Sequence, residues 1–319
     1  MTVSGSLLIA TGADAVYFPM VRELLASVRA HAPGPVGFGV IDGGLTPEQR
    51  EWLAAEGARI AAPPALADAA RAVRARPALA VNLGKLWLDR LFPDHETLLW
   101  LDADTWVQQW EAVALLAGAA ETGALAIVPG AGRFWKRQID VRWIAGGVGG
   151  IGQVRSFNFK NAWHARLPLS VCRDLGTRAL LNAGAFALPA AAAHWERLRH
   201  WQARILRHGK PFTSDQLAMA MAVYIEELPT ELLPTNCNYV SPRRVDAARG
   251  LLLEHYYPYR PVGIVHLAAE KRMRFDPEAK VTLLGLDGRR WQASLRYGWL
   301  QRDLSAACEA DPGRGVCRA

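Results

Sequence analysis

The chain has 319 residues, of which 51% are hydrophobic and 21% charged, and its formal net charge is +7. This composition is ordinary for a soluble globular protein with a sizeable core. Apolar stretches such as residues 7–10 and 98–101 are far shorter than the roughly 20 residues needed to span a bilayer. The positive charge favours anionic ligands or surfaces, such as nucleotides, nucleic acid or acidic lipid, without choosing among them.

The first half of the chain alternates between strand-like and helix-like segments. Apolar runs predict strands at residues 7–11, 36–41, 59–61, 97–101 and 125–128. Apolar residues at helical spacing predict helices at 21–28, 47–57, 83–91 and 110–122. The second of these helices follows a capping box formed by Thr46 and Gln49. Short links between such segments imply βαβ units in a mostly parallel, doubly wound sheet, whose ligands bind beyond the carboxyl ends of the strands.

The second half of the chain is less regular. Residues 130–180 are rich in glycine, arginine and aromatic residues and have no clear period. Beyond them we expect strands at 183–188 and 262–267, helices at 194–205 and 214–224, and a hairpin around Asp287-Gly288. No internal repeat and no clean domain boundary is recognisable.

The most informative segment is 97–104, in which an apolar strand ends in Asp102 and Asp104. Residues i and i+2 of an extended chain point to the same side, so the two carboxylates can converge on one cation. Carboxylate oxygens suit hard divalent ions such as Mg²⁺ or Mn²⁺. Such an ion on a diphosphate would neutralise the charge that grows as the diphosphate leaves. The alternative is a plain helix cap or turn after a strand.

The sequence Leu-Trp-Leu-Asp-Ala-Asp-Thr at 99–105 resembles the Asp-x-Asp strand of glycosyltransferases with the GT-A fold, particularly glycosyltransferase family eight. That family contains retaining enzymes, similar to glycogenin and the bacterial lipopolysaccharide galactosyl- and glucosyltransferases. Several motifs between residues 7 and 272 occur in the family's order. The resemblance implies a GT-A fold, a nucleotide-sugar donor beside Ala103, and a metal held in part by Asp102 and Asp104.

Two further motifs resemble sugar-binding residues of the family. Asn182-Ala183-Gly184 is similar to its Asn-x-Gly strand entry, in which Asn182 can bond sugar hydroxyls and Gly184 lets the backbone approach the ligand. Ser214-Asp215-Gln216 resembles its Asp-Gln at a helix start, which implies that Asp215 and Gln216 lie near the reacting sugar. From the residues alone, a plain turn before a strand and an ordinary helix start remain open.

The predicted strand at 262–267 contains His266, at the place where the family has a His that completes the metal site. An imidazole ligand favours Mn²⁺ over Mg²⁺. The family continues as His-x-x-Gly-x-x-Lys, whereas here the glycine is Ala269 and ungapped counting puts Arg272, not Lys271, at the basic position. Either cation could hold the diphosphate. The alternative for His266 is a structural histidine at a strand end.

The resemblance extends to the first loop and to one lysine. Ala10, Thr11, Asp14 and Tyr17 resemble the family's nucleotide-binding loop, in which Tyr17 could stack on a base and Asp14 could read a uracil edge. Lys85 lies before the acidic strand, where the family often has a basic residue facing the diphosphate-sugar. An ordinary loop and a solvated helix lysine are the alternatives.

Two other segments carry patterns that the predicted site does not use. Residues Gly147 to Gly152 match the glycine pattern of dinucleotide-binding proteins, but no strand plainly precedes them, so we interpret them as a glycine-rich loop. The segment from Arg133 to Trp143 is basic with interleaved aromatic residues. It is an ordinary exposed loop or a contact for an acceptor or a membrane surface, and nucleic acid is the least favoured ligand.

The four cysteines show no paired metal spacing. Cys308 and Cys317 are close enough in sequence that a disulfide between them remains an alternative. The N-terminus has no signal-peptide pattern. We therefore expect a cytoplasmic protein, with peripheral contact at the inner face of the membrane through residues 133–143, and no nucleic-acid partner.

We predict one large α/β domain of the GT-A type over residues 1–300. Its nucleotide-binding part covers about 1–130, its irregular acceptor-side part about 131–300, and a tail follows at 301–319. The expected function is metal-dependent, retaining transfer of a hexose from UDP-glucose or UDP-galactose to a hydroxyl of a glycan, lipid-linked or protein acceptor. Mn²⁺ is the expected metal and Mg²⁺ its substitute. A nucleotidyltransferase and a non-catalytic nucleotide-sugar-binding relative remain alternatives.

Overall fold

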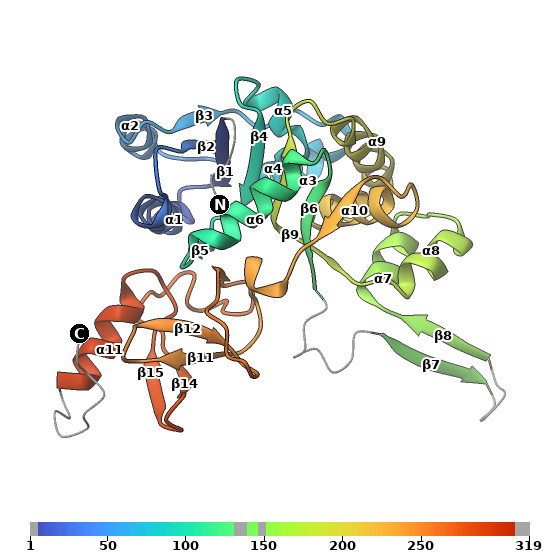
Figure 1. Cartoon of the computed structure of the whole chain (residues 1–319). Coiled ribbons are helices and arrows are strands. Elements are labelled where there is room, and N and C mark those ends of the chain that lie inside the picture. The colour runs from blue at the N-terminus through green and yellow to red at the C-terminus, as the bar shows by residue number, and fades with distance from the viewer. Residues whose placement is uncertain (1–5, 131–138, 146–150, 310–319) are drawn as a thin grey trace.

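A seven-stranded mixed sheet forms the centre of the molecule (Figure 1). The computed structural model describes residues 6–130, 139–145 and 151–309. In spatial order the sheet contains β10 (Thr230–Leu232), β6 (Leu125–Pro129), β9 (Leu181–Pro189), β4 (Thr97–Leu101), β1 (Leu7–Ala13), β2 (Gly37–Asp42) and β3 (Arg59–Ala61). The strands predicted in the first half of the chain are confirmed.

One strand of this sheet runs against its neighbours. β4, β1, β2 and β3 are parallel, and so are β6 and β10. β9 is antiparallel to both β4 and β6, and its register pairs Ala185 with Leu101. The start of β9 therefore lies beside the carboxyl end of β4, where ligands of doubly wound sheets bind.

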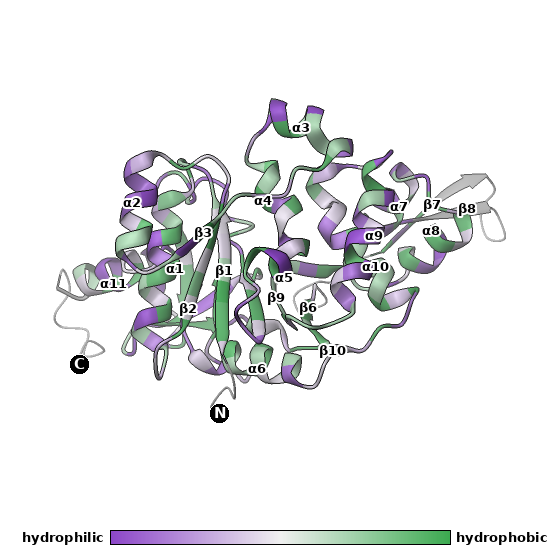
Figure 2. Ribbon diagram, turned by 90° about the horizontal axis from the view of Figure 1, so that it is seen from above, coloured by the Kyte–Doolittle hydropathy of each residue, from purple (hydrophilic) through white to green (hydrophobic). Residues whose placement is uncertain are grey.

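Both faces of the sheet are buried by helices. Leu7, Ile9 and Leu99 pack with α1 (Phe18–His31) and α6 (Trp110–Glu121), whereas Leu8 and Trp100 pack with helices of the second half of the chain. Figure 2 shows α1 and α2 beside β1–β3, and α7–α10 in the other half of the molecule. A strand buried on both faces has a continuous apolar sequence, which is why residues 97–101 are recognisable as a strand.

Three of the remaining helices match predicted segments, namely α2 (Pro47–Ala55), α9 (His194–Leu206) and α10 (Ser214–Tyr224). The capping box of α2 is formed, because Thr46 and Gln49 each accept a hydrogen bond from the other's backbone N–H. Three short helices were not predicted, because each is too brief to show a helical period. They are α3 (Ala70–Ala75), α7 (Phe157–His164) and α8 (Leu169–Gly176).

The helix expected at 83–91 is divided. The structure has α4 (Leu79–Gly84), then a 3₁₀ turn over Lys85–Trp87, and then α5 (Leu88–Leu91). Leu83 and Leu86 of the predicted apolar pattern are buried, whereas Trp87 and Leu91 are only partly buried. The tighter turn contains Lys85, which is also buried, and such short 3₁₀ segments often occur at functional positions.

A smaller sheet lies beside the central one and has its own core. It contains β12 (Leu251–Glu254), β11 (Arg243–Asp246), β14 (Val281–Gly285) and β15 (Arg290–Ala293), with α11 (Trp299–Glu309) packed against it. The hairpin predicted around Asp287-Gly288 is confirmed as β14–β15. Leu300 and Leu304 of α11 are buried, so the folded chain continues past residue 300, where we expected a tail to begin.

A two-stranded connection joins the two sheets. β5 (Thr105–Val107) pairs antiparallel with β13 (Ile264–His266), and His266 lies opposite Thr105. The sequence did not predict β5, because three residues after a turn carry too little pattern. This pairing brings His266 to the end of β4.

Gln108, directly after β5, is also part of this connection. Its buried amide donates to the carbonyls of Leu252 at 2.9 Å and Val262 at 2.7 Å, and it accepts from the Leu252 N–H at 2.8 Å. The smaller sheet is therefore tied to β5 through buried polar groups that pair with one another.

The irregular middle region contains a ribbon of β7 (Asp140–Ala145) and β8 (Ile151–Arg155), which projects from the body in Figure 1. Residues 133–138 and 147–150 of the two segments discussed above lie outside the described residues. A strand, β8, begins at Ile151 within the glycine-rich segment and continues past it, whereas dinucleotide binding requires a helix there. Within the described part of the chain, no helix is both long and apolar enough to cross a membrane.

Replacing Gln108 with Leu should destabilise the fold, because three buried hydrogen bonds lose one partner without a polar substitute. We expect the free energy of unfolding to fall by about 3 kcal/mol. Gln292→Leu is the matched control, since Gln292 is exposed on β15, and we expect a change within about 0.5 kcal/mol. Urea denaturation measures both, and equal stabilities of the two variants would contradict the assigned role of Gln108.

Candidate functional site

The ends of β1, β4 and β13 and the start of β9 surround a cavity of about 620 Å³, within the roughly 300–1,000 Å³ typical of ligand pockets. Most of the predicted site residues line it. They are Asp14, Tyr17, Lys85, Asp102, Ala103, Asp104, Asn182, Gly184, Asp215, Gln216, His266 and Lys271. The predicted motifs from distant parts of the chain therefore converge on one cavity.

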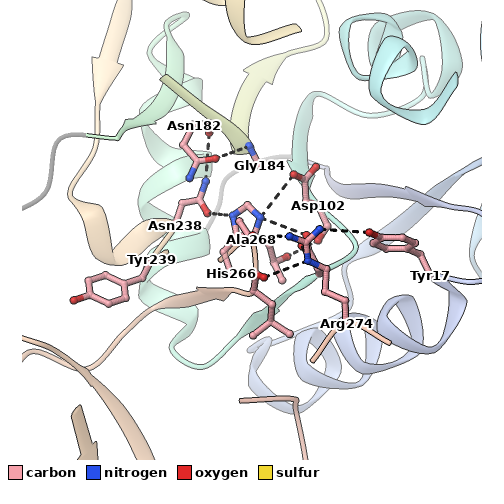
Figure 3. Close-up of polar contacts among 12 residues, drawn as sticks. Tyr17, Asp102, Asn182, Gly184, Asn238, Tyr239, His266, Ala268 and Arg274 are labelled. Carbon is pink, nitrogen blue, oxygen red and sulfur yellow. Dashed lines mark hydrogen bonds and ion pairs between the residues drawn. The ribbon is translucent and has the colours of Figure 1, made fainter. Parts of the chain in front are cut away.

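Asp102, Asp104 and His266 form a compact group in this cavity, and Figure 3 shows Asp102 and His266 of this group. One ligand atom from each lies within 4.8 Å of the others. His266 Nε2 is 3.3 Å from Asp104 Oδ1 and 3.9 Å from Asp102 Oδ2. Burial by itself would raise the pKa of Asp104, but His266 and Arg274 outweigh it and hold that pKa below its usual value. Two carboxylates and one imidazole are a donor set that fits a divalent cation.

The imidazole of His266 is held in an orientation that suits metal binding. Its Nδ1 lies 2.8 Å from Asn238 Oδ1, and Asn238 Nδ2 donates to the Asn182 carbonyl at 3.3 Å. The amide oxygen of Asn238 can only accept, so Nδ1 carries a proton, and Nε2, which faces the carboxylates, is the nitrogen that could bind a cation. Figure 3 shows this chain of contacts running from Asn182 through Asn238 to His266.

Gly184 is required by the close packing of these groups. A Cβ atom on it would collide with the His266 ring at Cε1 and would lie 3.0 Å from Asp102 Oδ2. Its backbone carbonyl accepts from the Asp102 N–H at 2.8 Å, directly beyond the last paired residues of β4 and β9. The missing side chain at Gly184 therefore makes room for the candidate metal ligands themselves.

Lys85 joins the acidic pair to Asp215. Its buried ammonium lies 2.7 Å from Asp102 Oδ1 and 3.3 Å from Asp215 Oδ2. Burial alone would lower the pKa of Lys85, but the two carboxylates outweigh it and the pKa is raised. Lys85 is therefore a charged, buried cation and not the solvated helix lysine that the sequence left open.

Asp215 has one carboxylate oxygen without a hydrogen-bond partner among the described residues. Oδ2 faces Lys85, whereas the buried Oδ1 has no hydrogen-bond partner within the described residues. Burial is the main cause that raises the pKa of Asp215. Gln216, the next residue of α10, also lines the cavity. A sugar hydroxyl is a donor that could satisfy Oδ1.

Arg274 is a site residue that the sequence analysis missed. Its Nε lies 3.2 Å from Asp104 Oδ2, and its Nη1 donates to the Tyr17 hydroxyl at 3.4 Å. The signal was present as a third basic residue after His266, but the ungapped motif directed attention to Lys271 and Arg272. Asn238, which holds His266, lies in no motif and could not be found from sequence.

Three predicted site residues lie away from the cavity. Ala10 and Thr11 are fully buried along β1, and the cavity wall begins at the next residue of that strand, Gly12. The side chain of Arg272 is 84% exposed and pairs with Asp276. Of the two cations left open by the sequence, Lys271 is the one that lines the cavity.

Asp14 and Tyr17 do reach the cavity, but Asp14 also has a local role. One of its carboxylate oxygens accepts from the backbone N–H groups of Val16 and Tyr17. The same carboxylate therefore holds the loop that places Tyr17 at the cavity wall.

The cavity has two chemically different sides. The segment after β13, which reaches Tyr17 through Arg274, offers the cations Lys271 and Arg274, and these suit anionic oxygens. The starts of β9 and α10 offer Asn182 and Asp215, which suit hydroxyl groups. The candidate metal group contacts both sides, through Arg274 and through Lys85.

Comparison with solved structures shows which fold this chain has. A galactosyltransferase, LgtC, solved with donor and acceptor sugar analogues, is 14% identical, with a TM-score of 0.50 and alignment over 82% of this chain and 86% of that one. The bifunctional glycosyltransferase WbbM (16% identity, TM-score 0.47, 74% and 40% covered) and mouse xyloside xylosyltransferase 1 (11%, 0.47, 83% and 98%) are also similar. In sequence, neither a family model nor a curated protein matches this chain. The fold assignment rests on the galactosyltransferase, and the expected GT-A fold is confirmed.

Replacing Gly184 with Ala should displace His266 or Asp102 and weaken Mn²⁺ binding. We expect a loss of about tenfold or more, as for other changes that reorient metal ligands. Gly118→Ala is the matched control, because Gly118 lies in α6 with no atom within 4 Å of its added Cβ. Calorimetric titration with Mn²⁺ measures both proteins, and an unchanged affinity in Gly184→Ala would show that the collision does not involve a metal site.

Replacing Lys85 with Met should destabilise the protein in a pH-dependent way. Two carboxylates at the cavity lose their cation, which costs about 3–5 kcal/mol when both are charged and buried. The pKa of Asp215 is already raised and should rise further. When the pKa of a carboxyl is higher in the folded than in the unfolded protein, the free energy of unfolding falls as pH rises. We therefore expect Lys85→Met to lose more stability at pH 8 than at pH 5.

Urea denaturation of Lys85→Met at the two pH values measures this effect. Lys271→Met removes an exposed lysine of the same cavity and should change stability by no more than about 0.5 kcal/mol. A loss in Lys85→Met that does not depend on pH would contradict the role of Lys85 as the partner of buried carboxylates.

Proposed function

We propose that this chain, a protein with the GT-A fold, is a metal-dependent retaining glycosyltransferase that moves a hexose from UDP-glucose or UDP-galactose to an acceptor hydroxyl. The observation that carries the proposal is the group of Asp102, Asp104 and His266 inside the cavity, with His266 oriented by Asn238. A divalent cation bound by these ligands, Mn²⁺ by preference, supplies positive charge that offsets the charge developing on a leaving diphosphate.

The nucleotide is assigned to the side of the cavity near Tyr17. The aromatic ring of Tyr17 offers a surface for a base, and Asp14 lines the same cavity. Lys271 and Arg274 are the cations of this side and are assigned to the diphosphate oxygens. Both assignments rest on position and charge complementarity.

The sugar is assigned to the side formed by Asn182, Asp215 and Gln216. Asp215 is buried and ion-paired with Lys85, so its unpartnered Oδ1 is better suited to accept from a sugar hydroxyl than to attack carbon. The amide of Asn182 can donate to a hydroxyl or accept from one. The neutral amide of Gln216 could stabilise a sugar carbon that becomes cationic, but it is a poor nucleophile.

The proposed reaction balances without a covalent enzyme intermediate. The bond between the sugar C1 and the diphosphate oxygen breaks, and the acceptor oxygen bonds to C1 on the face that UDP leaves. The acceptor's proton passes to the departing phosphate oxygen. Lys85 keeps Asp102 and Asp215 in place during this exchange, because it contacts both.

The acceptor is assigned to an apolar wall of the same cavity. Phe157 and Phe212 line it and are 45% and 56% exposed. Arg76 lies over the ring of Phe212, 5.6 Å from its centroid. Aromatic surfaces of this kind are common in ligand pockets and could take a glycan, a lipid-linked sugar or a protein segment. We place the reaction in the cytoplasm, with membrane contact through residues 133–143.

Thermal melting with nucleotide sugars tests the proposed donor. We expect UDP-glucose or UDP-galactose to raise the midpoint with Mn²⁺ and not with EDTA, because a ligand at about 100 times its Kd stabilises by about 2.7 kcal/mol. Asp104→Asn should lose this shift and release UDP about 100-fold more slowly or worse. Asp174→Asn, an exposed change on α8, should behave as the unmodified protein.

The products distinguish the proposal from its rivals. Release of UDP with a new glycosidic bond supports a glycosyltransferase. Release of pyrophosphate would instead identify a nucleotidyltransferase, and metal-dependent binding without turnover would identify a non-catalytic relative. Full activity in Asp104→Asn would overturn the metal assignment.

A further inference from the structure

Arg274 contacts three different parts of the cavity at once. Its Nε lies 3.2 Å from Asp104 Oδ2 and 3.3 Å from the Leu267 carbonyl. Its Nη2 donates to the Ala268 carbonyl at 2.5 Å, and its Nη1 reaches the Tyr17 hydroxyl at 3.4 Å. Figure 3 shows the guanidinium between Tyr17 and the candidate metal group. The side chain is 19% exposed, so it is largely shielded but still borders the cavity.

The carboxylate of Asp104 is shared between two positively charged or basic partners. Oδ1 lies 3.3 Å from His266 Nε2, and Oδ2 lies 3.2 Å from Arg274 Nε. A divalent cation held by Asp102, Asp104 and His266 would draw on the same negative charge that Arg274 uses. Like charges repel strongly in a shielded site, so the cation and Arg274 must compete for Asp104.

In the proposed reaction, the diphosphate of the donor is a second anionic partner for a guanidinium released from Asp104. Its planar set of donors fits two phosphate oxygens, and it keeps its charge at any physiological pH. The contacts to the Leu267 and Ala268 carbonyls and to Tyr17 would keep it beside the nucleotide side of the cavity. Only a small rearrangement of the side chain is then required.

We propose that Arg274 competes with the divalent cation for Asp104 in the nucleotide-free protein and moves to the diphosphate when the nucleotide binds. This inference rests on the proposed function. Its consequence is that metal and nucleotide bind cooperatively. The diphosphate draws Arg274 away from Asp104, which leaves Asp104 to the metal, and a metal on Asp104 in turn releases Arg274 to the diphosphate. Such coupling is reciprocal. Arg274 thus both opposes the binding of metal alone and binds the metal-bound diphosphate.

Two effects of opposite sign follow for Arg274→Ala. Mn²⁺ alone should bind about threefold tighter or more, because its competitor is gone. UDP at saturating Mn²⁺ should bind about tenfold weaker, because the diphosphate loses a bidentate partner. Arg274→Lys keeps the charge without the planar fork, so it should retain weak Mn²⁺ binding and recover only part of the UDP affinity.

Arg272→Ala is the matched control, because Arg272 is two residues away, exposed and paired with Asp276 outside the cavity. Calorimetric titrations with Mn²⁺ alone and with UDP in Mn²⁺ measure all four proteins, and thermal midpoints establish that each is folded. A purely structural role of Arg274 predicts weaker binding of both ligands in Arg274→Ala. That result, or unchanged affinities for both ligands, would overturn the inference.

The same titrations separate this inference from the proposed function. If the unmodified protein binds neither Mn²⁺ nor UDP, the proposed function fails and the inference fails with it. If the unmodified protein binds both and Arg274→Ala behaves as Arg272→Ala, the inference alone is wrong.

Discussion

The structure depends on how negative charge is neutralised at the end of β4. Asp104 and Asp215 are buried and Asp102 is partly so, and carboxylates in such a place require cations close by. Lys85 pairs with Asp102 and Asp215, whereas Arg274 and His266 contact Asp104. The balance is held by residues from four separate parts of the chain. Any ligand that adds or removes charge here must therefore rearrange contacts already in place.

The scaffold brings these residues together through two antiparallel strand pairings. β9 runs antiparallel to β4, so Gly184, near the start of β9, lies beside Asp102. β13 pairs antiparallel with β5, so His266 lies opposite Thr105 and close to Asp104. The absence of a side chain at Gly184 lets the residues of the two pairings approach one another without a collision.

The proposed sugar transfer depends on two cations that neutralise the acidic pair, Lys85 and Arg274. Lys85 and Arg274 each hold one residue of the acidic pair, but they differ in what they can do. Lys85 is enclosed and pairs with two carboxylates, so it is suited to fixing positions. Arg274 borders the cavity and shares its carboxylate with the candidate metal, so it is suited to changing partners. The same electrostatic constraint thus accounts for a residue that fixes positions and for one that we propose changes partners.

Local patterns of polarity and spacing predicted the central strands and suggested the acidic pair, whereas the resemblance to the glycosyltransferase family pointed to the motifs at Asn182, Asp215 and His266. The resemblance also pointed to Ala10, Thr11 and Arg272, which the folded chain places away from the cavity, because a motif in the sequence does not say which way a side chain faces. Three features emerged only from the folded chain: the antiparallel direction of β9, the contact by which Asn238 orients His266, and the reach of Arg274 to Asp104. Each joins segments that are separate in the sequence, and its geometry is set by packing and by the burial of charge.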